Sequence, residues 1–140
     1  MRYATKDSFI TVKEIDMGMV ADLGTLQRLP KIIADGIARE MAYTARKVSG
    51  EEAASFGLVN AAYEDQEEMM EEVMKIAGMI ASKSPLSIRG TKEMLNYARD
   101  HSVADGLNYI ATWNAGMLLS DDLMKAMQAH MTRSTPEFEG

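Results

Sequence analysis

The sequence contains no cysteine. Disulfide bonds, zinc sites with thiolate ligands and cysteine nucleophiles are therefore excluded for these 140 residues. Aromatic residues are scarce, at 6 % of the chain, whereas methionine occurs 13 times. Because methionine is flexible and fills irregular gaps, we expect a methionine-rich core.

Positive charge is also in short supply. Lysine and arginine total 15 against 21 aspartates and glutamates, which gives a net charge of -6. A nucleic-acid partner is disfavoured, because a phosphate backbone needs a basic face. A local basic pocket for one phosphorylated ligand remains compatible with this balance. No apolar run approaches the roughly 20 residues that a membrane span needs.

Residues 8–14 alternate in a period of two and predict a β-strand. Ile10, Val12 and Glu14 share one face, so a carboxylate ends an otherwise apolar face. The strand has no evident partner, and unpaired backbone groups are unfavourable. Three explanations are open: the strand pairs with residues 58–61, it pairs with another chain, or its partner strands are missing from this sequence.

Beyond residue 22 the apolar spacing predicts helices almost throughout. A helix over 23–34 is interrupted by Pro30, and another covers 36–45. Further helices are predicted after four capping residues or pairs: Ser49 with Glu52, Asp65 with Glu68, Ser84 before Pro85, and Ser102 with Asp105. Ser120 begins the last helix, and two acids follow it.

Three blocks of sequence resemble the enoyl-CoA hydratase/isomerase, or crotonase, family. In residues 9–30 a strand ending in Glu14 leads through Gly18 to the segment 24–30, which is similar to the family's Gly-Thr-Gln-Arg-Leu-Pro helix. Residues 44–60 match a second block and residues 83–85 a third. These matches run across nearly the whole chain, so together they are specific.

The resemblance implies a helix-rich α/β chain that forms the C-terminal part of a crotonase (ClpP/crotonase-like) fold. Residues 1–62 would end the crotonase core, with a strand, the active-site loop and helices, and 63–140 would form a helical oligomerisation region. In the family a first half of strand-strand-helix units supplies most of the acyl-CoA pocket and part of the oxyanion hole. The chain alone is therefore expected to lack activity.

Asp22 refines the comparison. Most similar hydratases have glycine at this position, whereas Asp22 eight residues after Glu14 resembles the dienoyl-CoA isomerases. The resemblance implies isomerisation of 3,5-dienoyl-CoA to 2,4-dienoyl-CoA in fatty-acid β-oxidation. Glu14 would act at C2 and Asp22 at the distal end of the diene, because moving a proton along the chain needs a base and an acid.

Simpler interpretations of both residues are open. Asp22 precedes a predicted helix and is a natural N-cap. Glu14 is a strand-end acid, and such acids usually face water. Lys83 and Lys92, together with Arg89, form a basic group that could meet the phosphates of coenzyme A. A solvated helix face explains the same three residues.

The remaining expectations follow from the resemblance. The partner molecules are an acyl-CoA substrate and further copies of the chain, as a homotrimer or hexamer. No metal and no separate cofactor is expected, since coenzyme A arrives with the substrate. The alternatives are an enoyl-CoA hydratase and a non-catalytic helical self-association module. The expected compartment is the cytoplasm if the protein is bacterial, and otherwise the mitochondrion or the peroxisome.

Overall fold

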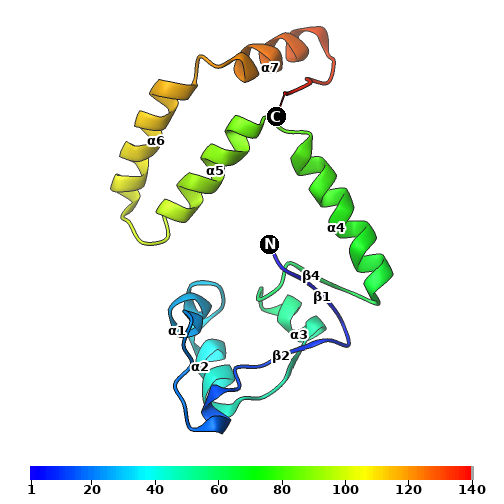
Figure 1. Ribbon diagram of the computed structural model, residues 1–140, viewed down its shortest axis with the longest axis vertical. Helices are drawn as coiled ribbons and strands as arrows, with labels where there is room; N and C mark the ends of the chain where they lie inside the picture. The colour runs from blue at the N-terminus through cyan, green and yellow to red at the C-terminus, as the bar shows by residue number, and fades with distance from the viewer. Residues whose placement is uncertain (140) are drawn as a thin grey trace. The chain divides into compact units, whose positions relative to one another are not determined.

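A computed structural model describes residues 1–139, which form two compact units that divide between Met74 and Lys75. Figure 1 shows the helices and strands along the chain. The first unit combines four short strands with short helices, and the second is helical. No helix among the described residues is long and apolar enough to cross a membrane.

Two small sheets organise the first unit. Strand β1 (Tyr3–Thr5) pairs in parallel with β4 (Ala61–Tyr63), and β2 (Phe9–Ile10) pairs antiparallel with β3 (Val48–Ser49). The predicted strand over 8–14 is therefore too long, and its partner within this chain is β3, not residues 58–61.

The chain leaves the extended conformation after Ile10 for a local reason. The Thr11 hydroxyl donates a 2.7 Å hydrogen bond to the Ala45 carbonyl, and Lys13 already has helical backbone angles. Val12 is buried in the core, outside any strand ladder. Its burial produced the alternating pattern that resembled a longer strand.

Short helices fill most of the remaining first unit: the 3₁₀ helices η1 (Glu14–Met17) and η2 (Leu29–Lys31), and the α-helices α1 (Thr25–Arg28), α2 (Asp35–Thr44) and α3 (Gly50–Ser55). Pro30 lies in the first turn of η2, which confirms the predicted break. The helix predicted over 36–45 is confirmed as α2.

Met41 and Val48 are fully buried at the centre of the first unit. They pack with a cluster of apolar side chains: Val12, Leu29, Ile33, Ala38, Ala53, Leu58 and Val59. Gly50 begins α3 so close to β1 that a Cβ there would lie 2.0 Å from the Thr5 carbonyl oxygen. No larger residue fits this position without moving the backbone.

The longer helices follow in order: α4 (Gln66–Ala81), α5 (Pro85–Tyr97), α6 (Val103–Met117) and α7 (Asp121–Thr132). The predicted N-caps of these four helices are confirmed by side-chain hydrogen bonds to the backbone: Asp65, Ser84, Ser102 and Ser120. Ser102 and Asp105 form the complete reciprocal box, whereas Glu68 accepts from the Glu64 N–H at 2.9 Å.

The predicted reciprocal role of Glu52 is wrong. Ser49 does cap α3 by accepting a hydrogen bond of 3.1 Å from the Glu52 N–H. The Glu52 carboxylate instead receives two bonds from the Arg46 guanidinium, at 2.7 and 3.0 Å. A charge-assisted bidentate pair is stronger than a bond to a neutral N–H, which explains why Glu52 bonds to Arg46 and not to the Ser49 backbone.

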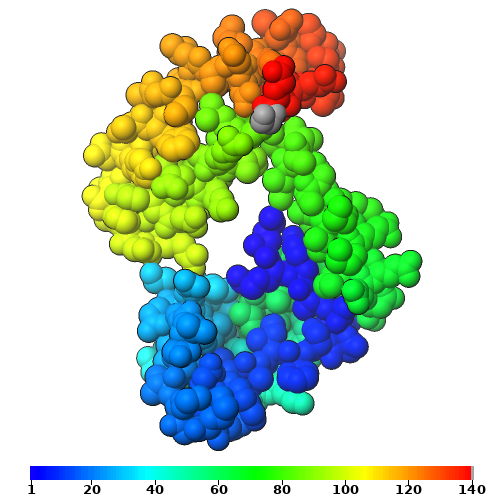
Figure 2. Space-filling view, in the orientation of Figure 1, coloured from blue at the N-terminus to red at the C-terminus, as the bar shows by residue number. Residues whose placement is uncertain are grey.

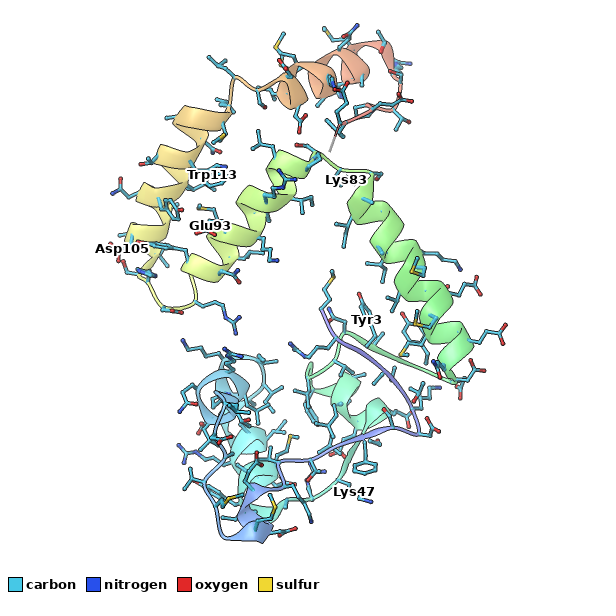
Figure 3. All side chains as sticks on the ribbon, viewed as in Figure 1. Tyr3, Lys47, Lys83, Glu93, Asp105 and Trp113 are labelled. Carbon is cyan, nitrogen blue, oxygen red and sulfur yellow. The ribbon has the colours of Figure 1, made fainter. Side chains whose placement is uncertain are left out.

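In the second unit α5 and α6 lie against each other, with Trp113 projecting from α6 toward α5 in Figure 3. A Cβ at Gly90 of α5 would lie 2.6 Å from Trp113 Nε1, so glycine allows this contact. At the turn between the helices, the rings of Tyr97 and His101 stack 3.6 Å apart. The Tyr97 ring of α5 also lies 4.7 Å from the Tyr109 ring of α6, so an aromatic contact joins the two helices at this end.

Candidate active site

Glu14 is the first residue of η1. Its carbonyl accepts a 3.0 Å hydrogen bond from Met19 N–H, and Gly18 closes the turn with a left-handed φ of 68°. The residue is half-buried. The structure thus places Glu14 at the start of a backbone-bonded turn and not at the end of a strand, which corrects that part of the prediction.

Asp22 is exposed in the connection between η1 and α1. The N-cap of α1 is Gly24, and no side chain caps this helix. Interpreting Asp22 as an ordinary helix cap is therefore wrong, because only its backbone carbonyl is used, accepting from Thr25 N–H at 3.1 Å.

The backbone after Asp22 turns sharply. Leu23 and Gly24 both have positive φ, 50° and 87°. The Arg28 side chain lies over Gly24, with Nε 3.2 Å from the place a Cβ would occupy. Asp22 therefore lies at the entry of a tight turn and not in an extended loop.

Between the two acids the chain exposes apolar side chains. Four of them are more than 45 % exposed, namely Ile15, Met17, Met19 and Val20, and so is Leu23, which directly follows Asp22. They belong to the blue part of the first unit, which lies on the surface in Figure 2. An apolar surface flanked by two carboxylates suits a ligand with an apolar body and a site of proton transfer.

Within residues 1–139 the carboxylates of Glu14 and Asp22 form no ion pair and no side-chain hydrogen bond. Their neighbour Asp16 differs, because it pairs with Lys13. Both candidate acids are thus free to exchange protons with a ligand. Their catalytic roles stay a prediction.

The predicted basic residues belong to the second unit. Lys83 precedes the N-cap of α5 (Figure 3), and Lys92 lies within that helix. Both are exposed, as is Arg89, and none of the three pairs with an acid in the described part of the chain. Contact with coenzyme A phosphates stays a prediction.

No group of three potential metal ligands gathers among residues 1–139. One feature of the site escaped the sequence reasoning, namely the exposed Leu23 with its left-handed backbone. The sequence feature that could have indicated it is a leucine between Asp22 and Gly24, in a segment with neither helical nor strand period.

Comparison with known proteins gives a consistent picture. Residues 1–140 match the profile of a family described as enoyl-CoA hydratase/isomerase. The human mitochondrial Delta(3,5)-Delta(2,4)-dienoyl-CoA isomerase is 48 % identical over 130 residues, which cover 92 % of this chain and 40 % of that protein. The peroxisomal enzyme of that name from Arabidopsis thaliana is 48 % identical over 138 residues, covering 99 % and 50 %.

Solved structures agree on the fold. The crystal structure of an enoyl-CoA hydratase from Bacillus anthracis matches with a TM-score of 0.93 at 28 % identity, covering 100 % of this chain and 54 % of that one. The helix-rich α/β prediction is thereby confirmed. The chain spans about half the length, or less, of the curated relatives it matches.

Proposed function

Because this chain belongs to the enoyl-CoA hydratase/isomerase family, we propose that the protein containing it isomerises 3,5-dienoyl-CoA to 2,4-dienoyl-CoA. The observation that carries the proposal is the sequence identity to named isomerases, and the state of the two candidate acids agrees with it. The chain is 48 % identical to relatives named for this reaction, and its two candidate acids, Glu14 and Asp22, are free of partners among the described residues. The same reaction places the protein in fatty-acid β-oxidation.

The reaction needs one proton removed and another delivered. The thioester carbonyl acidifies C2, and Glu14 takes that proton. The electron pair of the broken C2–H bond forms the 2,3 double bond, the pair of the 3,4 double bond moves to the 4,5 position, and the pair of the 5,6 double bond forms the new C6–H bond. Asp22 then gives a proton to C6. Each carboxylate serves one end of the diene, as general acid–base chemistry requires.

The test is turnover of a 3,5-dienoyl-CoA by the gene product containing this chain, followed through the absorbance of the conjugated product. We expect Asp22→Asn and Glu14→Gln each to lower kcat by roughly 100-fold to 10,000-fold, the usual contribution of a general acid or base. Asp16→Asn is the matched control, because Asp16 lies between them and pairs with Lys13. Its rate should stay near wild type.

Loss of activity in Asp22→Asn but not in Glu14→Gln would overturn the assignment of Glu14. Hydration of 2-enoyl-CoA is the competing activity, and the likeness to a solved hydratase supports it. The two are separated by offering both substrates to the same preparation. Faster turnover of the 2-enoyl-CoA would favour the hydratase.

We also propose that the protein self-associates as a trimer or hexamer through its helical region. Large apolar side chains stand exposed along α6 and α7 and the turn between them: Leu107, Leu118, Leu119, Met124, Met127 and Met131. A cavity of about 420 Å³ opens among α5, α6 and α7 and is lined by Leu95, Trp113 and Leu118. Exposed apolar surface of this extent is typical of an interface.

A further inference from the structure

Leu23 is the most exposed large apolar side chain among the described residues of the first unit, at 91 %. Its backbone φ of 50° lies in the left-handed region, which non-glycine residues other than asparagine and aspartate seldom adopt. Exposure and backbone conformation are thus both unfavourable at one residue. Such a combination points to a role at a functional site.

The position of Leu23 identifies the site. It directly follows Asp22, and the far side of the same turn is covered by the Arg28 side chain over Gly24. Val20, two residues before Asp22, is 78 % exposed, and Met19 is exposed beside it. The apolar side chains at the Asp22 turn are therefore Leu23, Val20 and Met19.

The chemistry of the substrate indicates which of its groups contacts the apolar side chains at the Asp22 turn. In the proposed reaction Asp22 protonates C6, the last carbon of the diene. Every carbon beyond C6 is a saturated methylene or methyl group, so the atoms next to the reacting carbon are purely apolar. They emerge within reach of whatever residue adjoins Asp22, and that residue is Leu23.

We propose that Leu23 is a specificity-determining residue that contacts the acyl chain beyond C6 and so favours long-chain substrates. This inference rests on the proposed isomerase activity and deepens it. Leu23 is almost fully exposed next to Asp22, and the Asp22 carboxylate has no partner among the described residues, so both are accessible to one ligand. Met19 and Val20 extend the same apolar surface.

The experiment compares kcat/KM for a short and a long 3,5-dienoyl-CoA whose acyl chains differ by several methylene groups. The variant is Leu23→Asn, because asparagine tolerates the left-handed conformation and keeps the turn while removing the apolar contact. We expect the long-to-short ratio to fall roughly tenfold, which corresponds to lost contact with about two methylene groups.

Two controls accompany the variant. Leu23→Met keeps an apolar side chain of similar volume and should preserve the ratio. Met79→Asn makes a comparable change at an apolar residue that is 58 % exposed in the other unit and lies outside the proposed self-association surface, and it should leave the ratio unchanged.

An unchanged ratio in Leu23→Asn would overturn the inference while leaving the isomerase proposal intact. So would a loss of thermal stability with both substrates affected equally, because Leu23 would then pack against protein. A wild-type protein that turns over neither dienoyl-CoA would overturn both proposals.

Discussion

Gly90 of α5 packs directly against the Trp113 side chain of α6. An alanine Cβ at residue 90 would lie 2.6 Å from Nε1 and 2.9 Å from Cε2 of a rigid indole ring. We expect Gly90→Ala to lower the free energy of unfolding by about 1–3 kcal/mol, the usual cost of overpacking. Urea unfolding followed by fluorescence of Trp113, the single tryptophan, measures it.

The matched control is Gly106→Ala in α6, where no atom lies within 4 Å of the added Cβ. Alanine is the better helix former, so this change should raise stability by about 0.5–1 kcal/mol. Equal effects from the two substitutions would contradict the described α5–α6 contact.

Glu52 and Arg46 form a pair whose effect depends on pH. The hydrogen bonds from the Arg46 guanidinium lower the pKa of Glu52 below its ordinary value, against a smaller opposing effect of desolvation. A carboxyl with a lowered folded-state pKa stabilises the fold above its unfolded pKa, and this stability is lost as the pH falls through the folded pKa.

We therefore expect Glu52→Gln to weaken the dependence of unfolding free energy on pH in the acidic range and to reduce stability at neutral pH. Denaturant titrations at a series of acidic pH values test this. Glu51→Gln is the neighbouring control, because that residue does not bond to Arg46. A pH dependence unchanged by Glu52→Gln would show that the pair contributes nothing.

Individual residues differ in how far sequence alone can predict them. The caps Ser84, Ser102 and Ser120 were predictable because a cap and its helix are local in sequence. The partner of Glu52 was not, because Arg46 approaches from a turn whose shape depends on tertiary packing. The left-handed backbone of Leu23 was likewise hidden, since leucine has no preference for it.

At the scale of whole elements, Ser84 joins the start of α5 to the start of α7. Its oxygen accepts from Ser87 N–H at 3.0 Å, and its hydroxyl donates to the Asp122 carboxylate. Ser84 is 8 % exposed, so both bonds are largely shielded from water. Ser102 caps α6 in an exposed position and bonds only within its own first turn.

Ser84→Ala should therefore destabilise the second unit more than Ser102→Ala. We expect about 1 kcal/mol for the lost cap in Ser102→Ala and about 2–3 kcal/mol in Ser84→Ala, where a buried bond to a charged group is also lost. Chemical unfolding of both variants measures the difference. A smaller cost for Ser84→Ala would mean that its bond to Asp122 contributes nothing to stability.

Long helices were predicted more accurately than short strands. Helices of three or four turns, such as α6, were predicted from period and caps together. The strands are two or three residues long, which is too short for a period to define, so β1 was missed and β2 was extended to Glu14. The choice of Glu14 and Asp22 as candidate residues does not depend on the strand boundary, because it rests on the motif around them, and their roles stay a prediction.

For the whole molecule, the proposed self-association is tested by light scattering. We expect a mass three or six times that of the single chain, and Leu119→Asp should lower it, because a charge in an apolar interface is costly. Tyr43→Asp, at an exposed residue of the first unit, is the control. A monomeric wild-type protein would contradict the proposal, and a stable trimer without turnover would favour a self-association module.

The most direct test of the central claim is exchange of the C2 hydrogen of a 3,5-dienoyl-CoA with D₂O, measured by mass spectrometry in Asp22→Asn. The proposed mechanism predicts that this variant exchanges deuterium at C2, because Glu14 still acts there, yet forms almost no 2,4-dienoyl product. Glu14→Gln should lose both exchange and product. Full product formation by Asp22→Asn would contradict the proposed division of work between the two carboxylates.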